Sequence, residues 1–127
     1  MHWPFRQPVP ASGRLVRIDE VHCCKPSQLR ARLAAHARGA TVWTAGNFTD
    51  IGLTGARDLE APIQRRFRSA AALCKAALKT ASGREPLVLL MSEHQFHAHS
   101  GDQRLRAVVD HEHCCVLVLC SWLQPST

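Results

Sequence analysis

The residues of this chain that could do chemistry gather in one stretch rich in histidine and cysteine. They are His94, His97, His99, His111, His113, Cys114 and Cys115. Imidazole nitrogens and thiolates are ligands that zinc, copper and nickel accept. The spacing matches no familiar zinc pattern, and turns tolerate histidine readily. A metal-binding hairpin over residues 94–115, as sensor or hydrolase, is therefore the alternative interpretation, with the ligands His94, His97, His99, His111, His113 and Cys114. We expect no bound cofactor.

The six cysteines indicate packing more than catalysis. Four of them form the vicinal pairs Cys23–Cys24 and Cys114–Cys115, and no C-x-x-C occurs. Prolines interrupt the first residues, so we expect no export signal, reduced thiols and a cytoplasmic protein. No G-x-S-x-G accompanies His22 and Cys24 as a nucleophilic site. These observations favour a protein that is not an enzyme.

Basic residues form the second group that could recognise a partner. The formal net charge is +6, and the candidate partner-binding residues are Arg65, Arg66, Arg68, Lys75 and Lys79. A stripe of this kind is typical of a solvated helix face, and it also fits an acidic partner or phosphates. Tyrosine is absent and only four Phe and three Trp occur, which leaves few aromatic platforms for single-stranded nucleic acid. Nucleic-acid binding is thus a third interpretation, and it is not favoured.

The element expected to carry these basic residues is one long amphipathic helix over residues 60–81. Apolar positions recur at steps of three and four, beginning with Ile63 and Phe67. Pro62 fits the first helical turn. Much of the apolar stripe is small, so another backbone can approach it closely. We therefore predict a two-fold dimer interface formed by Phe67, Ala70, Leu73, Cys74 and Ala77.

The remaining pattern predicts a mixed α+β domain. Residues 14–24 alternate as a strand, and residues 28–38 form a shorter N-terminal helix. Gly46 and Asn47 separate two β-rich runs, which predicts a tight hairpin over residues 40–53. Residues 86–99, 103–110 and 114–122 then form three strands of a meander. We expect an arm at 1–13, one domain at 14–123 and a tail at 124–127. The apolar run 114–120 is too short for a membrane span.

This order of elements resembles the Roadblock (dynein light chain) family and its profilin-like relatives. The stretches that carry the resemblance are residues 40–53, 60–81 and 86–119. It implies a five-stranded antiparallel sheet in the order 2-1-5-4-3 and a homodimer paired through the long helix. It also implies a non-catalytic interaction module that acts as an adaptor in motor or signalling assemblies, or as a regulator of a small GTPase.

Overall fold

Helices pack against a five-stranded sheet in this chain. The computed structural model describes residues 15–19, 21, 25–37, 40–53, 62–80 and 86–121. The elements are, in chain order, β1 (Leu15–Ile18), α1 (Pro26–Ala37), β2 (Thr41–Ala45), the 3₁₀ helix η2 (Thr49–Ile51), β3 (Ile63–Phe67), α3 (Ala70–Thr80), β4 (Leu87–Ser92), α4 (Glu93–Ala98), α5 (Gln103–Asp110) and β5 (Cys114–Leu119). The arm and the tail predicted at 1–13 and 124–127 lie outside the described residues.

The strands lie in the order β1-β5-β4-β2-β3, and every neighbouring pair runs parallel. A five-stranded sheet is therefore confirmed, whereas the antiparallel arrangement and the order 2-1-5-4-3 are wrong. The physical reason lies in the two central strands, because β4 is buried at every position and β5 at all but one. Near-continuous apolar strands need cover on both faces, which the helical crossovers of a parallel sheet supply.

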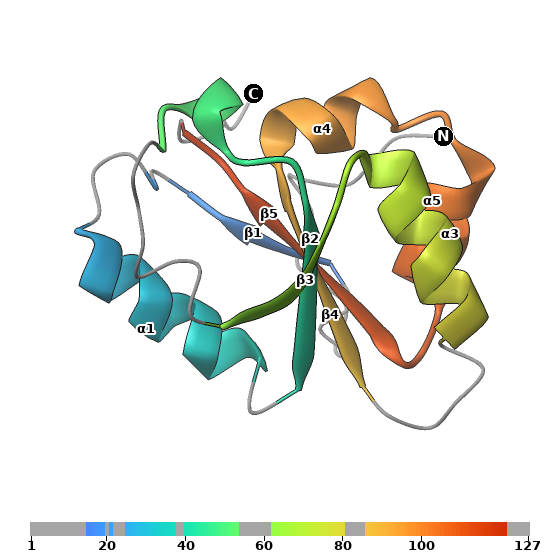
Figure 1. The fold of residues 1–127 in the computed structure, drawn as a ribbon, viewed down its shortest axis with the longest axis horizontal. Coiled ribbons are helices and arrows are strands. Elements are labelled where there is room, and N and C mark those ends of the chain that lie inside the picture. Colours follow the sequence, from blue (N-terminus) through green and yellow to red (C-terminus); the bar gives the residue numbers. More distant parts are fainter. Residues whose placement is uncertain are drawn as a thin grey trace, which may run out of the picture.

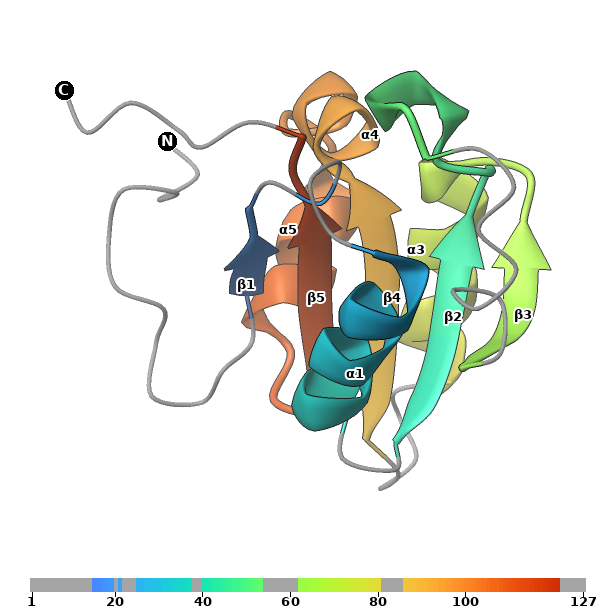
Figure 2. The same cartoon turned by 90° about the vertical axis from the view of Figure 1, so that its left-hand side faces the viewer.

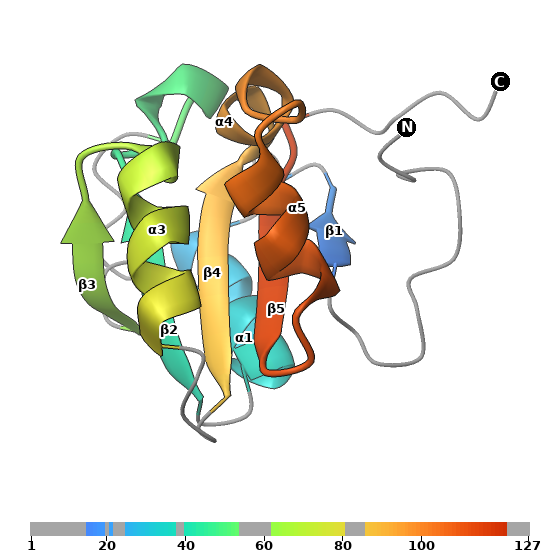
Figure 3. The same ribbon diagram turned by 90° about the vertical axis from the view of Figure 1, so that its right-hand side faces the viewer.

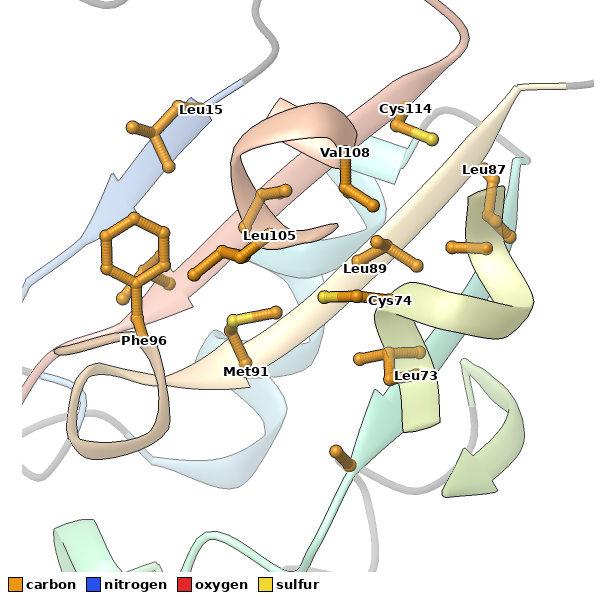
Figure 4. Packing of buried hydrophobic residues seen from close by; sticks show 14 of the residues in the cluster. Leu15, Leu73, Cys74, Leu87, Leu89, Met91, Phe96, Leu105, Val108 and Cys114 are labelled. Carbon is orange, nitrogen blue, oxygen red and sulfur yellow. The ribbon is translucent and has the colours of Figure 1, made fainter. Parts of the chain in front are cut away.

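The helices form a layer on each side of the sheet. Helix α1 covers one face, whereas α3 and α5 lie side by side on the other (Figures 1 to 3). Leu29 and Leu33 of α1 share one buried cluster with Val88 and Leu117 of the central strands. Figure 4 shows the opposite cluster, in which α3 and α5 pack on β4 and β5. The core therefore lies in two apolar layers separated by the sheet.

The hairpin predicted over residues 40–53 is wrong. Only its first run is a strand, β2, and the second run continues into η2. The turn residue Gly46 has a positive φ of 66°, but Phe48 (φ 42°) and Gly52 (φ 81°) are also left-handed. Phe48 and Ile51 are buried in the same apolar cluster as the side chains of α1. Burial of these two side chains curls the segment over the end of the sheet and prevents pairing back onto β2.

The single helix predicted over residues 60–81 is also wrong, because it divides into β3 and α3. Ile63 and Phe67 stand four residues apart, which fits a helix face, but with Arg65 they also alternate as in a strand. Strand β3 pairs with β2, and the Gly46 N–H donates to the Phe67 carbonyl at 3.0 Å. Ser69 marks the start of α3, since its Oγ accepts the Ala72 N–H at 3.1 Å.

The predicted three-strand meander is wrong between its first and last strands. Residues 93–98 and 103–110 form α4 and α5, so the predicted hairpin over 94–115 does not exist. Ser92 and Gln95 make a capping box at the start of α4, and the Asp102 side chain accepts the Arg104 N–H at 2.8 Å at the start of α5. These caps stabilise helix starts. The predicted strands at 14–24 and 114–122 and the helix at 28–38 correspond to β1, β5 and α1, whereas the strand predicted over 86–99 ends at Ser92 as β4 and is followed by α4.

Candidate functional site

Two regions of the surface gather polar side chains, and the first is the edge where β2 and β4 end. The chain leaves β2 toward β3 on one side and leaves β4 toward β5 on the other. Ligands of open parallel sheets commonly bind at such a point of divergence. We call the polar residues there the carboxyl-edge cluster: Asn47, Thr49, Asp50, Ser92, Glu93, Gln95 and Ser121.

Each of these polar side chains has a partner within the cluster. The buried Ser92 Oγ donates to Asp50 Oδ2 at 2.7 Å and accepts the Gln95 backbone N–H at 3.2 Å. Glu93 Oε1 accepts from the Ser121 backbone N–H at 3.0 Å and from its Oγ at 2.7 Å. Buried polar groups are satisfied in this way when they serve the fold. The cluster therefore fastens α4 and the loop after β2 to the ends of the strands.

The loop after β2 is fitted closely to this cluster. Gln95 Nε2 donates to the Ala45 carbonyl at 3.0 Å. A Cβ on Gly46 would lie 2.6 Å from that same Nε2 atom, a distance real Cβ atoms do not tolerate. Phe48 adopts a left-handed φ of 42° while its ring is buried. Internal contacts thus account for the conformation of the loop.

The second polar region is the edge formed by β3 and α3, which lie side by side in Figure 3. We call it the basic edge, and its members are Arg65, Arg66, Arg68, Lys75 and Lys79. All five side chains are exposed, and residues 62–80 contain no Asp or Glu. The sequence predicted these five as one stripe of a helix, whereas the structure takes them from a strand, a short link and a helix. The elements β3 and α3 are neighbours in space, but Arg65 and Arg66 project to opposite faces of β3, Arg65 toward Phe67 and Arg66 toward Phe48.

Within the basic edge, neighbouring arginines have different partners. The Arg66 guanidinium donates to the Gly46 carbonyl and lies 5.7 Å from the Phe48 ring centroid. The Arg65 guanidinium lies 4.5 Å from the Phe67 ring centroid and 5.4 Å from that of Trp43. In the described part of the chain, the charged groups of Arg65, Arg68 and Lys75 have no hydrogen-bond or ion-pair partner. Arg66 therefore fastens the loop, and the other three charges face solvent.

The residues predicted as a dimer interface lie mostly inside the chain. Ala70, Leu73, Cys74 and Ala77 are buried between α3 and the sheet, and Phe67 packs partly buried against the same cluster. Figure 4 shows Cys74 near the buried side chains of Leu73, Leu89 and Met91. The small stripe on α3 thus accommodates the sheet of its own chain, and a dimer stays a prediction.

The predicted metal ligands divide between opposite edges of the sheet. His94 and His97 lie on α4 and His99 follows it, beyond the end of β4, whereas His111, His113 and Cys114 lie at the start of β5 (Figures 2 and 3). Parallel strands begin at one edge and end at the other, which separates the two groups by the length of a strand. Within the described residues, no group of three His, Cys, Asp or Glu side chains could hold a metal ion.

The thiols that the structure describes are neutral core groups. Burial, with a smaller contribution from the charge of Asp102, raises the pKa of Cys74 to about 12. Burial likewise raises the pKa of Cys120 to about 12 and that of Cys115 to about 11, and it raises that of Cys114. A nucleophilic thiol needs a lowered pKa. These four cysteines therefore fit the predicted packing role, and Cys23 and Cys24 lie outside the described residues.

A cavity of about 290 Å³ opens at the edge where β4 and β5 begin. Its wall combines the apolar side chains of Ala37 and Val88 with those of His36, His113 and Cys115. Glu112 Oε1 lies 3.4 Å from His113 Nε2, so this imidazole has a partner beside it. The cavity is small for a ligand pocket, since such pockets usually begin near about 300 Å³.

Sequence reasoning missed several residues that shape these regions. Ser92 and Gln95 form an S-x-x-Q capping box at the start of α4, but the sequence pattern predicts a strand over these residues. The contact between the rings of Trp43 and Phe67, whose centroids lie 5.4 Å apart, could not be predicted, because the sequence pattern places Phe67 on a helix.

Within the described residues, none of the helices has the length and apolar character to cross a bilayer. Comparison with protein-family models, with curated proteins and with solved structures finds no match to this chain.

Proposed function

We propose that this chain is a non-catalytic interaction module that binds an acidic protein segment on its basic edge. The observation that carries the proposal is the charge of residues 62–80, where five exposed basic side chains occur without a single acidic one. Among the described residues, the charged groups of Arg65, Arg68 and Lys75 have no hydrogen-bond or ion-pair partner, so they are available to a partner of opposite sign. Such complementarity speeds and orients association. The carboxyl-edge cluster offers less to a ligand, because its polar groups already bond to one another.

A protein segment fits this edge better than a nucleic acid does. Sequence-tolerant binding of single strands uses exposed aromatic faces on which bases stack. Trp43 and Phe67 are partly buried against the core, and the Arg65 guanidinium lies over both rings. Tryptophan and arginine in contact are the residues most enriched at the centres of protein interfaces. We therefore do not propose nucleic-acid binding, and the experiment below would detect it as a contrary result.

The test is a fluorescence-anisotropy titration with a short labelled peptide of alternating glutamate and serine. We expect saturable binding that weakens as salt is added, because surface charges are screened. The double variant Arg68→Glu, Lys75→Glu should lower the affinity on the order of tenfold. The matched control is Lys25→Glu, Arg30→Glu, which makes the same charge change on the α1 side of the sheet and should have little effect.

Two results would contradict the proposal. One is an equal loss of peptide affinity in both double variants, which would show that binding depends only on the net charge of the protein. The other is tighter binding of a single-stranded oligonucleotide of the same net charge than of the peptide. The latter result would favour the nucleic-acid interpretation.

Other predictions remain beside this proposal. A homodimer and a small GTPase as partner stay predictions, because neither the fold nor the comparisons test them. The cytoplasm is the compartment we propose, because the four cysteines that the structure describes are free thiols and reducing compartments maintain thiols in that state.

A further inference from the structure

Arg65 differs from Arg66, Arg68 and Lys75 in how its side chain is held. It stands directly across from Trp43 in the pairing of β2 with β3. Phe67, two residues further along β3, projects to the same face. The guanidinium therefore lies against two rings, with centroid distances of 4.5 and 5.4 Å. Its N–H groups, in the described part of the chain, meet no acceptor.

We infer that Arg65, Trp43 and Phe67 form a carboxylate-binding site in which the Arg65 guanidinium binds one glutamate or aspartate side chain of the partner. The inference rests on the proposed function and names the residue that makes it selective. A guanidinium offers parallel N–H donors that match the two oxygens of a carboxylate. Aromatic faces stabilise the cation through their π electrons without using those donors.

The stack also lowers the cost of binding. A long exposed arginine loses rotamer freedom when it binds a ligand, and a side chain already held in place loses less. Arg68 and Lys75 are exposed and have no ring or hydrogen-bond partner among the described residues, so they lack this advantage. Arg66 is held too, but its guanidinium already donates to the Gly46 carbonyl. Compared with Arg66, Arg68 and Lys75, Arg65 alone combines a fixed side chain with donors left for a carboxylate.

The test compares two substitutions that preserve charge, Arg65→Lys and Arg68→Lys, in titrations with the glutamate–serine peptide. Lysine keeps the positive charge but has neither the paired donors nor the flat face of arginine. We expect Arg65→Lys to weaken binding about tenfold and Arg68→Lys by less than about twofold. In the wild type, the NMR signal of the Arg65 Nε–H should shift as the peptide is added, while that of Arg68 should shift less.

The outcomes separate the two proposals. If both lysine variants bind as the wild type does, or weaken binding equally, the carboxylate site is wrong and the basic edge still stands. An Arg65 Nε–H signal that stays in place at saturation contradicts the site in the same way. If the wild type does not bind the peptide at all, both the proposed function and the site are wrong.

Discussion

The carboxyl-edge cluster and the basic edge are both rich in polar side chains, but they differ in where their partners lie. In the cluster, Ser92 bonds to Asp50 and Gln95, and Glu93 bonds to Ser121. On the basic edge, no acidic residue occurs among residues 62–80. Chemical type alone would rank the cluster first, because it lies where ligands of parallel sheets commonly bind. Its internal hydrogen bonds assign it to the fold instead.

This difference separates the expected effects of mutation. A group bonded within the chain contributes to the free energy of unfolding, and its removal leaves a buried partner unsatisfied. An exposed charge without an internal partner contributes little to stability. Changes in the core and the cluster should therefore lower stability, whereas changes at the exposed Arg68 and Lys75 of the basic edge should lower only affinity.

Alkaline pH should have the largest effect on stability, and it should act through the buried thiols of the core. Folding raises the pKa of Cys74 and Cys120 from 9.0 to about 12. Unfolded thiols therefore lose protons first, and the free energy of unfolding falls as pH rises above 9, by about 1.4 kcal/mol per pH unit for each thiol. Urea denaturation at several pH values measures this slope. Replacing both cysteines with alanine should reduce the slope to the part that Cys114 and Cys115 contribute, and an unchanged slope would contradict the account.

Gly46→Ala should cause the next largest loss. The new Cβ would displace the Gln95 amide from the Ala45 carbonyl, and alanine disfavours the φ of 66°. Together, strain and the lost hydrogen bond should lower the free energy of unfolding by about 2 kcal/mol. Gly52→Ala is the matched control, since its φ is 81° but no atom lies within 4 Å of the new Cβ. An equal loss at both positions would mean that the contact with Gln95 is unimportant.

Ser92→Ala should cost about 1 to 2 kcal/mol, because it removes the cap of α4 and a buried hydroxyl. Ser69→Ala removes an exposed cap from α3 and should cost less. Thermal denaturation of the two variants compares these losses. Peptide affinity should be unchanged in Ser92→Ala at a temperature where it is folded. A loss of affinity there would move the binding site toward the cluster.

The smallest expected change in stability comes from Arg68→Glu, Lys75→Glu. Both side chains are exposed, so the free energy of unfolding should change by less than about 0.5 kcal/mol. Affinity for the acidic peptide should nevertheless fall. A large loss of stability would show that these charges have partners inside the chain, and the contrast between the two regions would disappear.

Much of the sheet and little of its topology could be predicted from the sequence. The apolar runs in β4 and β5 indicate buried strands, and the basic residues stand out by their charge, whichever elements carry them. The predicted strand direction is wrong because Gly46 and Asn47 fit a tight hairpin turn locally. In the structure, β2 pairs with β3 and β4 instead, and Phe48 and Ile51 are buried in the core. The prediction of a single helix over 60–81 is wrong because the spacing of Ile63 and Phe67 fits both a helix and a strand. Pairing with β2 decides between them, and no local signal reports that pairing.

The most direct test of the central claim is a map of backbone amide NMR shifts as the glutamate–serine peptide is added to the wild-type chain. It asks which of the described regions meets an acidic segment. We predict that the largest shifts fall on β3 and on the exposed side of α3, with smaller ones at Asp50 and Ser92. Shifts centred on the carboxyl-edge cluster, or on the cavity beside His36 and Cys115, would contradict the assignment of the basic edge as the partner surface.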